Sequence, residues 1–167
     1  GDIPWLSLSD IRDLDGKIIY GTKEYTNADG IANSSARILP AGTVVLSRTA
    51  SVGFVALMGK EIATSQDFVN WVCGPEIDPY FLAYLLRASR GYILSLASGA
   101  IHKTVYVPTV KAFEVCIPPI ESQRSIVKLL IVQMDSTDRV QENLKTQLDA
   151  INKLPAVLLR RAFRGDI

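Results

Sequence analysis

Three short polar segments carry hydrogen-bonding groups of the kind that distinguish the edges of nucleic-acid bases. Ser47–Ser51 contains Arg48, whose guanidinium can bond two acceptors of guanine at once. Thr64–Asp67 offers an amide suited to the N6 and N7 edge of adenine and a carboxylate suited to the cytosine amino group. Ser98–Thr104 contains the only histidine of the chain, followed by a lysine. The candidate base or phosphate contacts are Arg48, Thr49, Ser51, Ser65, Gln66, His102, Lys103 and Thr104.

Each segment also has an interpretation that involves no ligand. The segment around Arg48 fits a surface hairpin with a solvated arginine, and Gln66 fits a turn residue that bonds the backbone. The Ser98–Thr104 loop suits a phosphate contact as well as a base contact. Weaker candidates in a further polar segment are Lys17, Lys23 and Tyr25.

Short β-prone runs separated by turn residues predict the strands that position these segments. The predicted strands are Lys17–Tyr20, Thr43–Leu46, Val52–Leu57, Glu61–Thr64, Phe68–Cys73, Val105–Val107 and Phe113–Ile117. Met58-Gly59-Lys60 lies between two of them and predicts a hairpin. Asp78-Pro79 has the N-cap and first-turn residues of a helix, which its apolar spacing extends to about Ala97.

The C-terminal part has a different period. No Gly or Pro occurs between Glu121 and Leu154, which predicts one long helix. Pro155 is expected to kink or restart it, and a short helix over 156–163 then ends at Gly165. We therefore predict an α+β fold with a β-rich domain over 1–118 and a helical region over 119–167.

Apolar residues of the long helix follow alternating steps of three and four, as in a coiled coil. The predicted pairing positions are Val127, Leu130, Met134, Leu144, Leu148 and Ile151, interrupted by Thr137 and Gln141. Burial against the chain's own core is the alternative. Pairing with a second long helix is favoured, because a small β-rich domain cannot cover a helix of this length.

Charge gives little sign of a nucleic-acid partner. The net charge is +1, with 10 Lys and Arg against 11 Asp and Glu in residues 1–118, and 8 against 6 in residues 119–167. A protein that relies on phosphate neutralisation usually has a clear basic excess. Any DNA specificity must therefore come from a local group of residues, or other subunits must supply positive surface.

The compartment is predicted from the cysteines and from the N-terminus. Cys73 and Cys116 lie far apart in apolar, strand-like surroundings, so we expect buried reduced thiols rather than a disulfide. The first residues lack the basic-then-apolar order of a signal peptide, and no run reaches the roughly 18 apolar residues of a membrane span. These features predict a cytoplasmic protein with no membrane contact.

Catalytic and cofactor motifs are not found in the sequence. Pro118-Pro119 follows Ile117 and precedes Ile120, so it lacks the Asp or Asn and the aromatic residue of an adenine methyltransferase. No glycine-rich loop is suited to S-adenosylmethionine or nucleotide phosphates, and the His and Cys spacing predicts no zinc site. The carboxylate pairs Asp13 with Asp15 and Asp135 with Asp138 are interpreted as a turn and a solvated helix face. We expect no catalytic residue, metal or cofactor.

Five stretches together resemble the specificity subunit of type I restriction-modification enzymes. GDIPWLSLSDI resembles an early segment of its target-recognition domain, and SSARILPAGTVVLSRTASVGFVAL resembles the central stretch. ATSQDFVNW matches the hairpin with Ala-Thr-x-Gln-x-Phe, IPPIESQRSIV the start of the spacer helix, and LLRRAFRGDI its closing signature. The family has a further segment before the first stretch, and a full subunit carries two recognition domains and two spacers. The chain is therefore expected to be a fragment or a half-subunit.

The resemblance implies a non-catalytic module that reads one half of a split site in double-stranded DNA. It implies that the spacer docks methyltransferase subunits and either self-associates or pairs with a second specificity half. Two alternatives stay open: a protein-interaction adapter or inhibitor built on the same fold, and the recognition region of a larger fused restriction-methylation enzyme.

Overall fold

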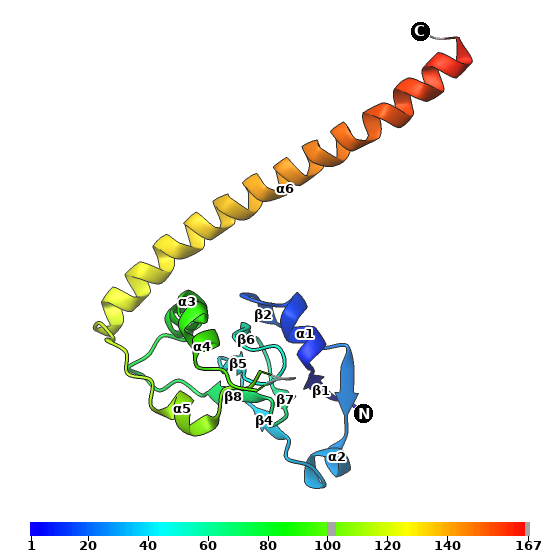
Figure 1. Ribbon diagram of the computed structural model, residues 1–167. Coiled ribbons are helices and arrows are strands. Elements are labelled where there is room, and N and C mark those ends of the chain that lie inside the picture. Colours follow the sequence, from blue (N-terminus) through cyan, green and yellow to red (C-terminus); the bar gives the residue numbers. More distant parts are fainter. Residues whose placement is uncertain (100–102, 166–167) are drawn as a thin grey trace. The chain divides into compact units, whose positions relative to one another are not determined.

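The computed structural model describes residues 1–99 and 103–165 and divides into two units (Figure 1). The first unit, Gly1–Val127, contains two four-stranded sheets and the shorter helices. The second unit begins at Lys128 and continues the last helix, α6 (Ile120–Arg164). This combination of sheets and a long helix confirms the predicted α+β class.

The first sheet joins segments from distant parts of the first 64 residues. Its order is β3 (Glu24–Thr26), β1 (Ile3–Leu6), β7 (Ile62–Thr64) and β4 (Arg37–Leu39). The two central strands are parallel, with Trp5 opposite Ala63, whereas both edge strands are antiparallel to their neighbours. β1, β3 and β4 have no counterpart among the predicted strands, because each is short, β1 contains a proline, and β3 and β4 are only partly apolar.

The second sheet lies between two apolar layers. Its order is β2 (Ile18–Ile19), β6 (Val55–Met58), β5 (Val44–Ser47) and β8 (Phe68–Trp71). Successive side chains of a strand point to opposite faces. Val44 and Leu46 accordingly belong to one core cluster and Val45 to the other. Every residue of β5 is therefore buried, which explains its continuous apolar run.

The predicted hairpin around Met58-Gly59-Lys60 is wrong. β6 pairs with β2 and β5, whereas β7 belongs to the other sheet. The Gly59 amide donates to the Ile19 carbonyl at 2.8 Å, and a Cβ at Gly59 would stand 2.4 Å from a Tyr20 ring carbon. The segment is a crossing from one sheet to the other, and a larger residue at position 59 would have to displace the Tyr20 ring.

The helix predicted from Asp78 to about Ala97 is two helices, α3 (Pro79–Ala88) and α4 (Arg90–Ser95). The Asp78 side chain accepts from the amides of Tyr80 and Phe81, which confirms the predicted N-cap. Ser89 separates the two helices, and α3 packs against β5 and β6. The apolar spacing continues across the break because both helices cover the same core.

The last two predicted strands are not formed. Residues 105–107 lead into a short helix, α5 (Val107–Lys111), and residues 113–119 contain neither helix nor strand. Cys116 is exposed there, so its predicted burial is wrong, while Cys73 is half-buried and both thiols are free. Burial, and to a lesser extent the Asp78 carboxylate, raises the pKa of the Cys73 thiol. The β-prone residues around Cys116 lack a neighbouring strand with which to pair.

Two further short helices of the first unit were not predicted. α1 (Leu8–Asp13) begins with a capping box, in which Ser7 and Asp10 each accept from the other's backbone amide. α2 (Ala28–Ala32) begins at Asn27, whose side chain accepts from the Gly30 amide. Both are only about one or two turns long, which leaves too little periodicity to detect.

The long helix is continuous through Pro155, so no second helix starts there. All residues around Pro155 are exposed, and water can therefore hydrate the carbonyl that loses its helical donor. None of the helices in residues 1–99 and 103–165 is long and apolar enough to cross a membrane.

Candidate nucleic-acid interface

Arg48 lies where the polar segments meet. It follows β5, and its backbone amide donates to the Asp67 carbonyl at 2.9 Å. Its own carbonyl accepts from the Val105 amide at 2.9 Å. One residue thus connects the turn before β8 with the segment that follows the Ser98–Thr104 loop. Together, Ser47–Ser51, Ser65–Asp67 and Lys103–Thr104 form what we call the three-loop surface.

Two more backbone contacts connect the first and third loops. Thr49 and Thr104 form an antiparallel bridge, and the Ala50 amide donates to the Lys103 carbonyl at 2.9 Å. Lys103 is exposed and Thr104 is half-buried. His102, the other candidate of this loop, lies outside the described residues.

The Arg48 side chain is oriented by the second loop. Its Nε donates to the Gln66 carbonyl at 2.7 Å. Gln66 is exposed, and its side-chain Oε1 accepts from the Ser35 hydroxyl. Ser65 closes the turn, since its hydroxyl accepts from the Asp67 amide and donates to the Asp67 carboxylate. Gln66 therefore orients Arg48 through its backbone carbonyl, and its side chain separately contacts the connection between α2 and β4.

Ser51 differs from the other candidates because it is buried, with 4% of its surface exposed. Its hydroxyl accepts from Arg12 Nε at 2.5 Å, and its carbonyl accepts from the Ser47 hydroxyl. A ligand at the surface would not reach this side chain. The structure places Ser51 in the support of the first loop rather than among its exposed contacts.

A charged pair holds the C-terminal end of the same loop. Arg90 donates from Nε to the Gly53 carbonyl at 2.7 Å and from Nη2 to Asp15 Oδ1 at 2.5 Å. Asp15 Oδ1 also accepts from the Val55 amide at 3.0 Å, and the Arg90 guanidinium lies 4.8 Å from the centre of the Phe54 ring. Sequence reasoning considered Asp15 only as half of a carboxylate pair, because a partner 75 positions away leaves no local signal.

The weaker candidates Lys17 and Lys23 both contact Asp13. Lys23 Nζ forms an ion pair with the Asp13 carboxylate at 2.6 Å, and Lys17 Nζ donates to the Asp13 carbonyl at 3.2 Å. The ion pair lowers the pKa of Asp13 and raises the pKa of Lys23. Lys23 is therefore engaged within the chain, unlike the exposed side chain of Lys103.

Within residues 1–99 and 103–165 no group of three or more His, Cys, Asp or Glu side chains could hold a metal ion. Asp135, which the sequence places near Asp138, forms an exposed ion pair with Arg139 at 2.9 Å. The polar groups brought together around Arg48 are hydrogen-bond donors and acceptors suited to binding.

The predicted pairing positions of α6 have unequal exposure. Val127 is buried in the first unit, with 6% of its surface exposed, so it is not accessible to a second helix. Leu130 and Met134 are half-buried. Leu144, Leu148 and Ile151 are exposed to 60%, 57% and 60%. The apolar positions open to a partner are therefore those in the C-terminal half of the predicted set.

The start of α6 is fixed to the first unit by Gln123, a residue that the sequence did not single out. Its side chain is fully buried. Nε2 donates to the carbonyls of Glu76 and Pro118 at 2.9 and 2.8 Å, and Oε1 accepts from the Asp78 amide at 2.9 Å. Three of the four hydrogen-bonding positions of one amide are thus used.

Comparison with known proteins gives consistent matches. The type I restriction enzyme MjaIX specificity subunit of Methanocaldococcus jannaschii is 26% identical over 98% of this chain and 37% of that protein. The StySPI specificity subunit of Salmonella potsdam is 26% identical over 52% of this chain and 19% of that protein. The chain therefore spans well under half the length of these relatives.

Solved structures have the same fold. A chain from a structural study of complex assembly and conformational transition of the type I R-M system superposes with a TM-score of 0.80 at 16% identity, over 99% of this chain and 39% of that one. The S subunit from M. genitalium gives a TM-score of 0.57 at 18% identity, over 83% of this chain and 33% of that one. A family model described as the type I restriction modification DNA specificity domain matches residues 1–150. This chain belongs to the type I restriction modification DNA specificity domain family.

Proposed function

We propose that this chain binds double-stranded DNA and reads one half of a split target site for a type I restriction-modification enzyme. The observation that carries the proposal is the meeting of three polar loops around Arg48 through backbone hydrogen bonds. Residues 1–118 form the recognition region in this proposal, and residues 119–167 form the helical spacer.

Arg48 is the proposed base-reading residue. Its Nε is held by the Gln66 carbonyl, which leaves its two terminal amino groups to bond guanine O6 and N7. Lys103, exposed on the adjoining loop, is assigned to a phosphate. Thr49 and Thr104 are assigned to DNA contacts between the base at Arg48 and the phosphate at Lys103. The preorganised backbone of the loops lowers the conformational entropy lost on binding.

The spacer is proposed to pair with another helix and to dock modification subunits. Leu144, Leu148 and Ile151 provide an exposed apolar face at helical spacing. Burying such side chains contributes roughly 1.5–3 kcal/mol each. A second copy of this chain, or the second half of a longer subunit, supplies the paired helix. Light scattering at micromolar concentration tests self-association, and a strict monomer argues for the longer subunit.

In this proposal the chain contributes recognition and no chemistry, and the modification subunits carry out catalysis. The competing class is an adapter or inhibitor that uses the fold without reading DNA. Such a protein would bind the modification subunits but show no base preference.

Selection from a randomised duplex library tests the proposal, with the chain alone and together with cognate modification subunits. We expect enrichment of one half-site. Arg48→Ala should relax the preference at one position by about 5- to 150-fold, the equivalent of about 1–3 kcal/mol. Binding without any base preference, or no binding in either form, would favour the adapter instead. Methylome sequencing of a strain that expresses this chain with its cognate modification subunit tests the same half-site preference in cells.

A further inference from the structure

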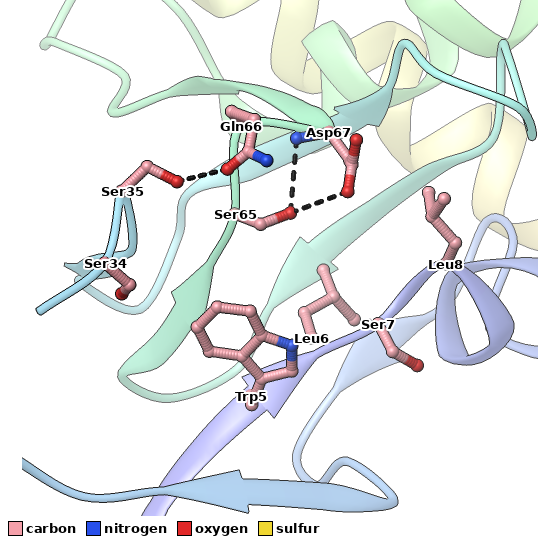
Figure 2. A pocket seen from close by; sticks show the side chains of 9 residues that line it. All are labelled: Trp5, Leu6, Ser7, Leu8, Ser34, Ser35, Ser65, Gln66 and Asp67. Atoms are coloured by element: carbon pink, nitrogen blue, oxygen red, sulfur yellow. Dashed lines mark hydrogen bonds between the residues drawn. The ribbon is translucent and has the colours of Figure 1, made fainter. Parts of the chain in front are cut away.

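A cavity of about 480 Å³, lined by both polar and apolar side chains, opens beside the three-loop surface. Its walls come from β1 and the start of α1, from the connection between α2 and β4, and from the turn before β8 (Figure 2). The lining residues are Trp5, Leu6, Ser7, Leu8, Ser34, Ser35, Ser65, Gln66 and Asp67. Trp5, Ser34 and Ser35 were not among the residues that the sequence analysis selected.

The cavity lies next to Arg48. Gln66 and Asp67 belong to its wall, and both accept hydrogen bonds from Arg48 through their backbone carbonyls. A DNA duplex that contacts the Arg48 side chain would therefore lie close to the cavity as well.

Two polar side chains of the cavity wall, Gln66 and Asp67, have opposite hydrogen-bonding roles: one can donate and the other can accept. The Ser35 hydroxyl donates to Gln66 Oε1, which leaves the Nε2 amino group of Gln66 to donate (Figure 2). Asp67 Oδ2 accepts from the Ser65 hydroxyl at 3.1 Å. In the part of the chain that the structure describes, no hydrogen bond reaches Asp67 Oδ1. The cavity wall thus contains one available donor, on Gln66, and one available acceptor, on Asp67.

We propose that this cavity selects a base with an exocyclic amino group, adenine or cytosine, next to the base read by Arg48. This inference rests on the proposed function. An amino group can donate to Asp67 Oδ1, and Gln66 Nε2 can donate to adenine N7. Guanine and thymine instead present carbonyl oxygens in the major groove, which would face the carboxylate with no proton between them. The same carboxylate repels a phosphate, so the cavity binds a base edge.

The decisive variant is Asp67→Asn, which keeps the shape and can still accept from Ser65 but replaces a carboxylate oxygen with an amino group. Selection from a randomised duplex library should show the preference at one position moving from adenine or cytosine toward guanine or thymine, by at least tenfold. Ser35→Ala, which releases Gln66, should weaken the preference at that same position several-fold. Asp149→Asn, an exposed substitution on α6, is the matched control and should change no position.

Tryptophan fluorescence reports ligand contact independently of base preference. The chain has two tryptophans, so Trp71→Phe leaves Trp5, in the cavity wall, as the only one. The selected duplex should alter Trp5 emission in this background, and Asp67→Asn should remove the response to that duplex while preserving the melting temperature. Unaltered Trp5 emission in the presence of a bound duplex overturns the inference.

The two proposals fail in different ways. If Asp67→Asn leaves the base profile unchanged, or lowers affinity equally for all sequences, the cavity does not select a base. The proposed function then still stands, provided that Arg48→Ala relaxes its own position. If the parent chain itself shows no base preference at any position, neither variant can alter one, and the proposed function itself fails.

Discussion

The three-loop surface and the exposed length of α6 obtain their structure in different ways. In the loops, hydrogen bonds join residues that are distant in sequence, such as Arg48 with Asp67 and Ala50 with Lys103. Beyond Lys128 the side-chain contacts are local, as in the i,i+4 ion pair of Arg139 with Asp135. The loops rest on a buried core, whereas the helix displays Leu144 to solvent. The chain's own fold specifies the first region, whereas the second displays an apolar face that is open to solvent.

The largest expected effect comes from placing charge on that apolar face. The double variant Leu144→Asp with Leu148→Asp should abolish association through α6, because two apolar contacts worth roughly 1.5–3 kcal/mol each are replaced by carboxylates that must be desolvated. We expect at least a 100-fold weaker dimer, or a lost complex with the second specificity half, by sedimentation or light scattering.

Thr146→Asp serves as the control for this pair, since it lies on the opposite side of the same helical turns. It should leave association intact. Melting of the first unit should be the same in both variants. Equal association of the double variant and the control would mean that the apolar face is not an interface.

The next largest effect is expected at Gln123, whose side chain holds the start of α6 within the first unit. Gln123→Ala leaves the Asp78 amide and two carbonyls without their partner, and each buried unpaired group costs about 1–3 kcal/mol. We expect a loss of at least about 3 kcal/mol in the free energy of unfolding, measured by denaturant titration. A loss below about 0.5 kcal/mol would show that water replaces the amide.

Gln123→Glu sharpens the same test through its pH dependence. A buried carboxylate facing two carbonyls has its pKa raised above the unfolded value of about 4.3. The variant is therefore least destabilised below that unfolded pKa, and it loses stability as the pH rises through the folded value. Unfolding titrations between pH 4 and 8 should show this slope in the variant and not in the parent protein.

A smaller effect is expected from the pair that supports the Arg48 loop. Arg90→Ala removes the hydrogen bonds to Gly53 and Asp15. The side chains of Arg90 and Asp15 are 32% and 19% exposed, so the pair is largely shielded from water. We expect a cost of about 1–3 kcal/mol together with weaker DNA binding. Arg90→Lys keeps the charge and one donor, so it should recover part of both. Reduced stability with unchanged DNA affinity would show that the loop does not depend on this pair.

The smallest effect is expected at Ala50, the only non-glycine residue with a positive φ among the residues described, at 56°. The left-handed conformation costs an L-residue roughly 1–2 kcal/mol, and the extra unfolded-state freedom of glycine offsets about 0.5–1 kcal/mol of it. Ala50→Gly should therefore raise the melting temperature by about 1–3 °C. Ala41→Gly, in an exposed turn, is the matched control and should not raise it.

The sequence predicted the elements whose residues follow a clear period. The buried runs around Val44, Val55 and Phe68, the Asp78 cap and the long helix were all found. The partners of the strands were not, because a glycine between two β-prone runs looks the same in a hairpin and in a crossing between sheets. The run around Cys116 failed for a related reason, since β propensity alone does not supply a neighbouring strand.

The candidate loops were selected from their side-chain chemistry, and the structure shows that they meet. Their supports were not predictable, because Arg12, Arg90 and Ser35 reach them from positions 39, 37 and 31 residues away. The burial of Ser51 has the same cause. A polar residue in a turn gives no sequence signal of a distant arginine that covers it.

The bonds that align the three loops run from backbone amide to backbone carbonyl at Arg48, Ala50 and Val105. Such bonds do not depend on which side chains the residues carry. Substitutions at the exposed positions can consequently change the side chains of this surface while the loop framework persists. A TM-score of 0.80 at only 16% identity shows that the fold itself persists when most side chains differ. Under the proposed function, such a framework lets the base preference change one substitution at a time.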